Sequence, residues 1–494
     1  MKNQSLPSKG SLFSQSLIAL VLIFYSINAF AAVEVGVVDY VRGVVTAQHG
    51  DEGTRIMGKS AKIFEKDIIT TANRSFAIVK MKDGTKITLR PNSSLGIEKY
   101  IARKGRSDSA VLNLFKGGIR AITGYISKTR NDAYKIRTPV ATIGIRGTEF
   151  DARLCEKDCR KESERFKQHH NVNTAFVVGR IAFMRGQVSA TGKYKKTRQL
   201  FTGGPLYEGD KVATGASSFT VIAFKDESRI TLNSESEFEI KKHHYDKKDA
   251  SLSSAFMSLL RGGLRATSGL IGKRNPAGYK MQTSVATIGI RGTGYDIHCD
   301  GKCVAQAPQS LMTPLEEMIN FFIKPVVATG NQGMYAHVWN GAIELTNNAG
   351  SQQLGLNETA FLRNIDSAPV MMPEIPLFMR SMPAPRPDTV EVAASMFTQE
   401  NTAETRAGLY VSVYDGHVSM SSEQGHRVDL GKGEAAFSGN VGSAQTAPVR
   451  LTGIPAFLAS DVYPRPESYN ETWENLFNDV TSPDENQDFE CTPQ

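Results

Sequence analysis

Thr138-Pro139-Val140-Ala141-Thr142-Ile143-Gly144-Ile145-Arg146-Gly147-Thr148 occurs twice in this chain, the second time as Thr283-Ser284-Val285-Ala286-Thr287-Ile288-Gly289-Ile290-Arg291-Gly292-Thr293. β-Branched residues fill the positions between the glycines of both copies, which favours an extended backbone. The glycines allow a positive φ or a close approach of two backbones. The stretch therefore predicts a strand that is interrupted by a bulge or a tight bend. A phosphate-binding loop is not indicated, because neither copy has the lysine and hydroxyl residue that complete such a loop.

The sequence around this stretch is repeated as well. Residues 76–81 return as 219–224, and residues 114–121 return as 259–266. These runs are short, rich in β-forming residues and separated by turn residues, which is typical of antiparallel strands. We therefore predict a mainly β fold with two duplicated, curled antiparallel β domains, β-hairpin tails and few short helices.

A second duplication follows the first. Residues 333–343 resemble residues 408–418, and each segment contains a dipeptide that suits a type I′ turn, Asn340-Gly341 in one and Asp415-Gly416 in the other. We expect a hairpin around each dipeptide. The order along the chain is then core, core, tail, tail.

This order predicts the domain organisation. If a copy of a core-plus-tail unit was inserted after the first core, the last tail completes the first core and the earlier tail completes the second core. The competing arrangements are that the tails form a separate domain, or that each tail serves the other core. The expected segments are a signal peptide (1–32), core 1 (33–160), core 2 (177–303), a helical connector (304–332), tail a (333–387, completing core 2), tail b (408–466, completing core 1) and an acidic tail (467–494).

The first 32 residues have the order of a secretory signal. Lys2 and Lys9 precede an apolar run, and a small-residue segment ends at Ala32. The apolar run is shorter than the ~20 residues that span a bilayer, so cleavage is favoured over an anchor. We expect a soluble, periplasmic protein that does not span the membrane after cleavage. The formal charge of +8 includes the two lysines of this signal, and the remaining mild basic bias does not indicate nucleic acid as a partner.

Each core ends in a pair of cysteines at the same spacing, Cys155 with Cys159 and Cys299 with Cys303. In an exported protein two local disulfides are the favoured use of these residues. A zinc site with four cysteine ligands from both copies is the alternative. Cys491 then stays free or pairs between chains.

No catalytic constellation is evident in the sequence, and we predict a protein that is not an enzyme and has no cofactor or metal. The adjacent pair His243-His244 is interpreted as solvated, because neighbouring residues of a strand point to opposite faces. Glu149 with Asp151 is the nearest approach to a pair of catalytic carboxylates, but it occurs in only one copy.

The two arginines of the repeated stretch are the best candidates for a structural or interaction role, together with the residues that follow them: Arg146, Gly147, Thr148, Arg291, Gly292 and Thr293. An arginine at this position could donate to backbone carbonyls at the bend. It could instead bind a carboxylate or a phosphate of a partner. The structural role is favoured, because carbonyl groups lie near any side chain between two glycines.

The repeated stretch after a Gly-Gly-Ile-Arg run, with Asp83-Gly84-Thr85 and Pro91-Asn92-Ser93 upstream, resembles the FecR-type periplasmic domain. The resemblance occurs twice and covers about 125 residues in each copy. It implies an exported β-rich interaction module. Sensor members of that family relay the state of a transporter to a sigma factor, but this chain lacks their sigma-regulating segment and spanning helix.

Three functions are compatible with these features. We favour a non-catalytic, exported binding or scaffold protein of the cell envelope, with an envelope protein or a cell-wall polymer as its partner. A soluble periplasmic component of envelope signalling, working with a membrane sensor or transporter, is the alternative. An enzyme acting on polysaccharide is the least supported.

Overall fold

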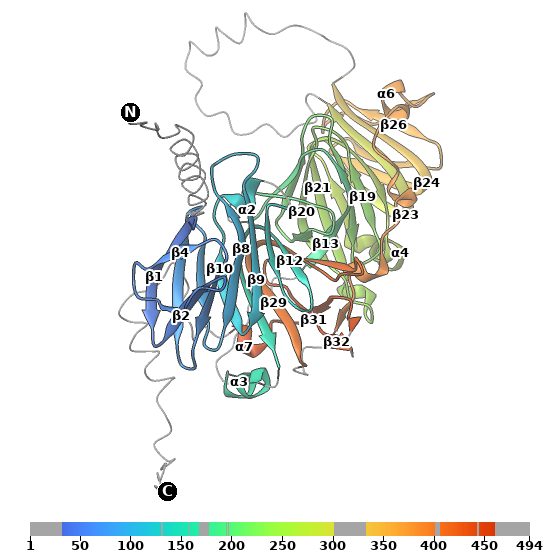
Figure 1. Cartoon of the computed structure of the whole chain (residues 1–494). Coiled ribbons are helices and arrows are strands. Elements are labelled where there is room, and N and C mark those ends of the chain that lie inside the picture. The colour runs from blue at the N-terminus through green and yellow to red at the C-terminus, as the bar shows by residue number, and fades with distance from the viewer. Residues whose placement is uncertain are drawn as a thin grey trace, which may run out of the picture.

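The computed structural model describes residues 32–129, 132–156, 158–166, 177–193, 195, 197–300, 332–400, 406–441 and 444–459. The predicted signal peptide, helical connector and acidic tail therefore lie outside the described residues, apart from residues 32 and 332. The described chain is mainly β, as predicted, and its strands form two large sheets, each with one copy of the repeat (Figure 1). We call them lobe 1 and lobe 2.

Lobe 1 contains β1 (Glu34–Arg42), β2 (Val45–His49), β3 (Arg55–Ile56), β4 (Lys62–Phe64), β5 (Asp67–Thr71), β6 (Phe76–Met81), β7 (Lys86–Leu89), β8 (Ser94–Ile101), β9 (Ser109–Lys116), β10 (Gly118–Ile122), β11 (Tyr134–Arg137), β12 (Thr142–Cys155), β28 (Gln399–Glu400), β29 (Gly408–Ser421), β30 (Arg427–Gly431), β31 (Ala435–Ser438) and β34 (Val449–Leu451), with the small ribbon of β32 (Asn440–Val441) and β33 (Ala444–Gln445) beside them.

Lobe 2 contains β13 (Val177–Arg185), β14 (Val188–Thr191), β15 (Thr197–Gln199), β16 (Pro205–Tyr207), β17 (Lys211–Thr214), β18 (Phe219–Phe224), β19 (Arg229–Leu232), β20 (Glu237–His244), β21 (Ser254–Thr267), β22 (Tyr279–Gln282), β23 (Thr287–Asp300), β24 (Gly333–Asn347), β25 (Gly350–Leu354), β26 (Thr359–Leu362) and β27 (Val370–Met372).

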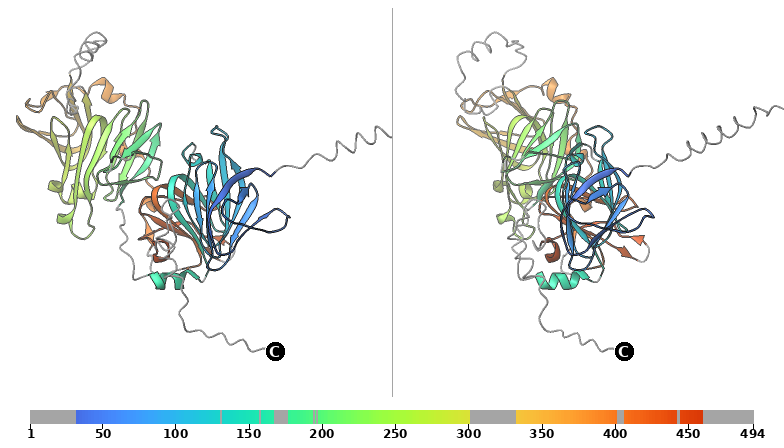
Figure 2. Two further views of the ribbon diagram at one scale, coloured as in Figure 1. Left: turned by 90° about the vertical axis from the view of Figure 1, so that its left-hand side faces the viewer. Right: turned by 60° about the vertical axis from the view of Figure 1, so that its left-hand side comes forward.

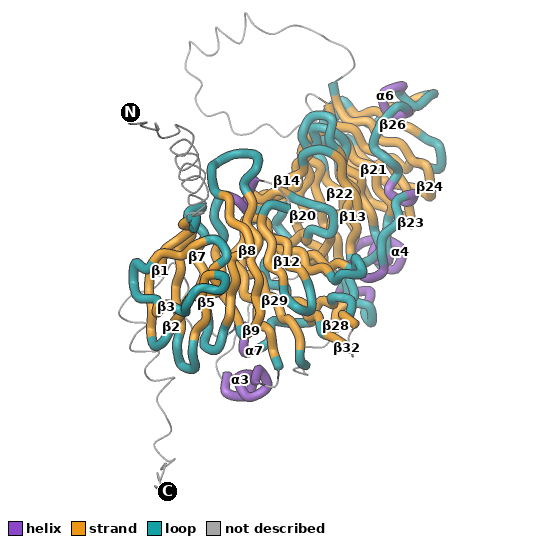
Figure 3. Tube along the Cα trace, viewed as in Figure 1, coloured by secondary structure: helices purple, strands orange, loops and turns teal. Residues whose placement is uncertain are grey.

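The same pairing scheme is used in both lobes. In lobe 1, β12 pairs with β11 through its first half and with β10 through its second half, so the sheet curls around one long strand. In lobe 2, β23 pairs with β22 and β21 in the same way. Figure 3 shows that strands dominate both lobes, with loops at their ends and few helical turns.

The last core strand of each lobe pairs with a strand from far along the chain. β29 runs antiparallel along the length of β12, and β24 does the same along β23. Side chains of β29, such as Leu409 and Val411, are part of the lobe 1 core. Side chains of β24, such as Met334 and Ala336, are part of the lobe 2 core. On these pairings we propose the nested organisation, in which 408–466 completes 33–160 and 333–387 completes 177–303.

The predicted hairpins at Asn340-Gly341 and Asp415-Gly416 are wrong. Each dipeptide lies inside one continuous strand, β24 or β29. A hairpin does follow in each tail, but the chain reverses later, between Asn347 and Gly350 in lobe 2. The glycines are needed instead because the facing strand comes very close: a side chain at Gly416 would collide with the carbonyl oxygen of Gly147.

The helices are short and lie at the ends of the sheets: α2 (Ile126–Thr129), α3 (Asp158–Phe166), α4 (Leu270–Arg274), α6 (Leu377–Arg380) and α7 (Ala456–Ala459). α3 follows β12 directly and packs beside α7. Within the described ranges no helix has the length and apolar character that crossing a membrane requires.

Candidate functional site

The repeated Arg-Gly-Thr segment forms a bulge, as its glycines predict. The pairing of β12 with β29 shifts register between Arg146 and Glu149, and Gly147 between them has a φ of +55°. Thr148 fixes the bulge, because its Oγ1 donates a hydrogen bond to the carbonyl oxygen of His417 at 2.8 Å. Such bulges reorient side chains at functional positions.

Lobe 2 repeats this geometry. The pairing of β23 with β24 shifts between Arg291 and Gly294, and Gly292 has a φ of +61°. Thr293 Oγ1 donates to the carbonyl oxygen of Ala342 at 2.6 Å. Both copies of the predicted site are therefore built alike in their backbone.

The two arginines lie in different surroundings. Arg146 is half-buried, and its guanidinium lies over the ring of Phe201 from lobe 2, with Cζ 3.6 Å from the ring centroid. Its Nη1 has no hydrogen-bond partner among the described residues. Burial, together with the nearby charge of Arg427, lowers the pKa of Arg146 to about 10. Arg291 is exposed to solvent.

Arg146 lies on the wall of a cleft between the two lobes, which stand side by side in Figure 2. The cleft has a volume of about 1550 Å³. It combines aromatic and charged side chains, among them Arg146, Phe201, Tyr207, His244, Asp415 and Lys432. A cleft with this lining can hold an extended ligand that carries both apolar and charged groups.

The lobes also contact each other directly. The buried side chain of Arg180 in lobe 2 forms an ion pair with Glu434 of lobe 1. Arg180 also donates to the carbonyl oxygen of Asp429 at 3.2 Å, and the Tyr207 hydroxyl donates to that of Lys432 at 2.9 Å. These contacts fix one lobe against the other.

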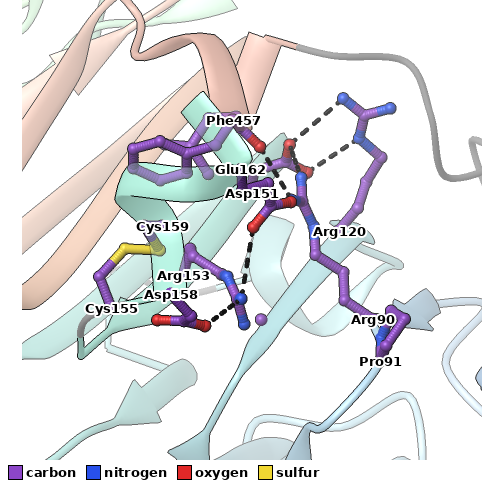
Figure 4. A network of polar contacts seen from close by, with 12 residues as sticks. Arg90, Pro91, Arg120, Asp151, Arg153, Cys155, Asp158, Cys159, Glu162 and Phe457 are labelled. Carbon is purple, nitrogen blue, oxygen red and sulfur yellow. Dashed lines mark hydrogen bonds and ion pairs between the residues drawn. A yellow bond between two sulfur atoms is a disulfide. The ribbon is translucent and has the colours of Figure 1, made fainter. Parts of the chain in front are cut away.

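Three residues after the bulge, Asp151 of β12 is part of a buried charge cluster (Figure 4). Asp151 lies between two buried arginines, with 2.8 Å from its Oδ1 to Arg120 Nε and 3.0 Å from its Oδ2 to Arg90 Nη2. Arg90 also donates to the carbonyl oxygen of Phe457 in α7 at 2.9 Å. Burial would lower the pKa of Arg120, but the Asp151 carboxylate outweighs it and raises the pKa. The cluster therefore connects β10, β12 and α7 with the segment around Arg90, and each of its charges is paired with an opposite one.

Lobe 2 contains a reduced form of this cluster. Asp296 accepts from Arg265 Nε at 3.2 Å and from Trp339 Nε1 at 2.9 Å. Asn233 occupies the place of the second arginine and donates to the Met382 sulfur at 2.8 Å. Burial raises the pKa of Asp296, although Arg265 opposes this shift.

Sequence reasoning missed this pairing of arginine with aspartate. The signal was available, because Arg120 and Asp151 recur as Arg265 and Asp296 at the same places in the two repeats. The proposed pair Glu149 and Asp151 is not a catalytic arrangement of two carboxylates in a cleft, because Asp151 is fully buried among the arginines.

The interpretation of His243 as a solvated residue is wrong. Its side chain is buried, its ring stacks on Phe224 with centroids 4.8 Å apart, and Nε2 lies 3.2 Å from Asp226 Oδ1. Its neighbour His244 is exposed, as the alternation along a strand requires. Position in the strand, which a pair of adjacent letters does not reveal, decides which of the two is buried.

Cys155 and Cys159 form the predicted disulfide, with Cα atoms 5.5 Å apart. It links the end of β12 to the start of α3. Cys299 is also disulfide-bonded. We propose Cys303, which lies outside the described residues with Cys491, as its partner. In the described part of the chain, no group of three or more histidine, cysteine or acidic residues is arranged to hold a metal ion.

Comparisons with known proteins give a family for the repeats. The family model described as "FecR protein" matches residues 67–164 and again residues 210–307. No curated protein matches the chain. Two crystal structures of a "putative anti-sigma factor" from Parabacteroides distasonis ATCC 8503, at 2.50 and 1.65 Å resolution, are similar at 11% identity and a TM-score of 0.23.

Each alignment covers 33% of this chain and 59% of the solved chain. The chain thus spans little more than half the length of the solved proteins it matches, and the family match rests on the two repeats alone. Those repeats carry the bulge, the arginine and the buried aspartate described above. One of the two regions that match the FecR model therefore lies in each lobe.

Proposed function

We propose that this chain is an exported, non-catalytic binding protein of the cell envelope, and that it binds an anionic group of an envelope protein or a cell-wall polymer in the cleft between its lobes. The observation that supports this proposal most is the position of Arg146. Its guanidinium is half-buried on the cleft wall, has a donor without a hydrogen-bond partner among the described residues, and lies over an aromatic ring.

The chemistry of this position favours a carboxylate or a phosphate as the bound group. An arginine that has lost part of its hydration gains most from an anion that accepts hydrogen bonds from it. The ring of Phe201 holds the guanidinium in place, which reduces the conformational entropy that binding would cost. The neighbouring aromatic and basic side chains supply further contacts for a peptide or a glycan chain.

A role in envelope signalling is the second candidate. The match of both repeats to the FecR family is the observation that favours it. In this role the cleft would receive a segment of a membrane sensor or transporter. Such a partner is a protein, whereas the first candidate also allows a wall polymer.

Two binding assays test the proposal. In the first, purified mature protein is incubated with isolated peptidoglycan. In the second, tagged protein is used to isolate envelope proteins, and each identified protein is then purified and tested for direct binding to the chain. We expect one of these ligands to bind, and Arg146→Gln to weaken binding at least about tenfold because a charged hydrogen-bond donor is lost. Arg291→Gln is the matched control, since it changes the same motif at an exposed position outside the cleft.

The outcomes separate the candidates. Binding to peptidoglycan supports the wall polymer, and binding to a reconstituted sensor or transporter supports signalling. Equal effects of the two arginine substitutions would show that the cleft is not the binding site.

Export is tested separately by cell fractionation. We expect a mature chain that begins at Ala32 or Val33, in the periplasmic fraction. Recovery of the full-length chain in membranes washed with salt and carbonate would contradict this part of the proposal.

A further inference from the structure

The contact between the lobes joins two unlike surfaces. Lobe 1 contributes β30 and the turn after it, residues 427–434, which we call the acceptor face. Lobe 2 contributes residues 200–207 and Arg180, which we call the donor face. The contact is therefore heterologous, and a heterologous contact between two similar units leaves one face of each unit unused.

Lobe 2 has its own acceptor face. Gly355 and Glu358 take the places of Gly431 and Glu434 in the tail repeat. The local hydrogen bonds are the same: Gly355 N donates to Glu358 Oε2 at 2.6 Å, and Gly431 N donates to Glu434 Oε2 at 2.9 Å. The backbone of each glutamate accepts from the facing strand at 3.0 Å, from Val338 or from Val413. The two acceptor faces thus have one conformation.

The acceptor face of lobe 2 is uncovered among the described residues. Gly431 lies against Pro205, whereas Gly355 has only the Glu358 side chain within 4 Å of a Cβ placed on it. Leu356 is 60% exposed. All of β25 except its last residue is exposed, whereas all of β30 except its first residue is buried.

Lobe 1 has the matching donor face. Ser60 corresponds to Gly203, and both have a positive φ, +67° and +84°. Ser60 N donates to the carbonyl oxygen of Val38 at 2.8 Å, as Gly203 N donates to that of Ile181 at 2.8 Å. The turn that docks in lobe 2 is therefore also present in lobe 1, where its residues 58–60 are exposed.

The charges of the two unused faces are complementary. Lys62 corresponds to Pro205, the residue that lies against Gly431 in the contact between the lobes. Its side chain is 64% exposed and forms an ion pair with Glu34 at 3.0 Å, so it would have to be shared between Glu34 and Glu358; the side chain of the neighbouring Lys82 is 51% exposed. A lysine at the place of Pro205 would lie over Gly355, whose amide already binds the Glu358 carboxylate. Lobe 1 has Val37 where lobe 2 has Arg180, so Lys62 would replace Arg180 as the cation.

We propose that molecules of this chain associate head to tail, with the donor face of lobe 1 in one molecule docked on the acceptor face of lobe 2 in the next. The contact repeats the internal one between the lobes. Its central ion pair joins Lys62 to Glu358, and Leu356 is covered at its edge. Because the contact is heterologous, it produces a ring or an open chain of molecules according to the rotation between neighbours.

Sedimentation velocity of the purified mature chain tests this proposal. We expect the average mass to rise with protein concentration, and the association to weaken between ~50 mM and ~500 mM salt because its central pair is exposed to solvent in the free molecules. Glu358→Lys is expected to raise the dissociation constant at least about tenfold, because it places like charges together. Glu235→Lys is the matched control, an exposed glutamate of the same lobe in the turn between β19 and β20.

A charge exchange identifies the two faces. Lys62→Glu alone should also prevent association, whereas a mixture of the Lys62→Glu and Glu358→Lys proteins should associate again, since each then offers a face that suits the other. A wild-type chain that remains monomeric at every concentration would overturn the proposal. Association that neither substitution weakens would overturn it as well, and would assign the contact to other surfaces.

Discussion

At the scale of single residues, the buried aspartate behind the bulge determines how well lobe 1 holds together. Asp151 compensates two arginines that are almost completely removed from water, Arg90 and Arg120. Charges in such a place are tolerated only while they are paired, because their desolvation is costly. The pairing therefore connects a tail that is distant in sequence to the first strands of the same lobe.

Substituting this aspartate is expected to be severe. Asp151→Asn removes the carboxylate that two buried arginines share, and we expect a loss of about 3 kcal/mol in the free energy of unfolding of lobe 1. Hydrogen exchange read by mass spectrometry measures the two lobes separately. Asp296→Asn is the matched substitution in lobe 2, where the single arginine partner is 16% exposed, and its loss should be smaller. Equal small losses at both sites would contradict the role assigned to the cluster.

A second residue makes lobe 1 sensitive to acid. Burial would raise the pKa of Asp429, but the hydrogen bonds and charges of His417 and Arg427 lower it from 3.8 to about 2. Because the folded state holds the carboxylate in its charged form, its stabilisation is complete above about pH 4 and is lost as the pH falls toward about 2. The loss is about 2 kcal/mol for a shift of this size.

Acid unfolding of the wild-type chain and of Asp429→Asn measures this contribution. The wild-type free energy of unfolding should fall more steeply between about pH 4 and pH 2, because the amide has no proton to gain. Parallel curves for the two proteins would assign the acid sensitivity to other carboxylates.

At the scale of the element, the bulge depends on the glycine that faces it. Gly416 has a φ of +84°, and a Cβ there would meet the backbone of Gly147. We expect Gly416→Ala to destabilise lobe 1 by more than the ~1 kcal/mol that a positive φ alone costs an alanine. Gly425→Ala is the control: it has a φ of +86° and open space around it. Similar losses of unfolding free energy at both positions would show that the close approach of the strands does not matter.

Local sequence patterns predicted those elements whose formation depends mainly on neighbouring residues. The β-branched residues predicted strands, the glycines predicted the bulge, and the repeated runs predicted two similar β units. Asn340-Gly341 was misread as a hairpin for a physical reason: a glycine with positive φ serves a turn and a bulge equally well. Which one forms is decided by the facing strand, and that strand lies elsewhere in the chain.

The candidate site was predictable only in part for a similar reason. Arg146 and Arg291 are found in identical segments, and nothing local predicts that one lies over Phe201 of another lobe while the other is exposed. The pairing of Arg120 with Asp151 is likewise a contact across strands. The only sign of this pairing in the sequence was that the same arginine and aspartate occur in both repeats.

At the scale of the whole molecule, the nested order predicts how the chain responds to truncation. Ending the chain after residue 400 removes β29, which pairs with β12 from Thr142 to Cys155. Lobe 2 keeps all of its strands. We expect lobe 1 to lose its protection from hydrogen exchange and from proteolysis, while the strands of lobe 2 in residues 197–300 and 333–372 stay protected. Loss of protection in lobe 2 with lobe 1 intact would refute the nested organisation.

The long separation between partner strands also has a consequence for synthesis. Thr148 and His417 are 269 residues apart in the chain, so β12 waits for its neighbour while the whole of lobe 2 is translated. At ~5–20 residues per second this delay is roughly 10–50 seconds. During this interval the newborn lobe 1 exposes an unpaired strand edge, the kind of edge that recruits other chains into aggregates. The edge therefore needs protection until residues 408–421 arrive, either from a chaperone or by keeping the chain unfolded until it is complete.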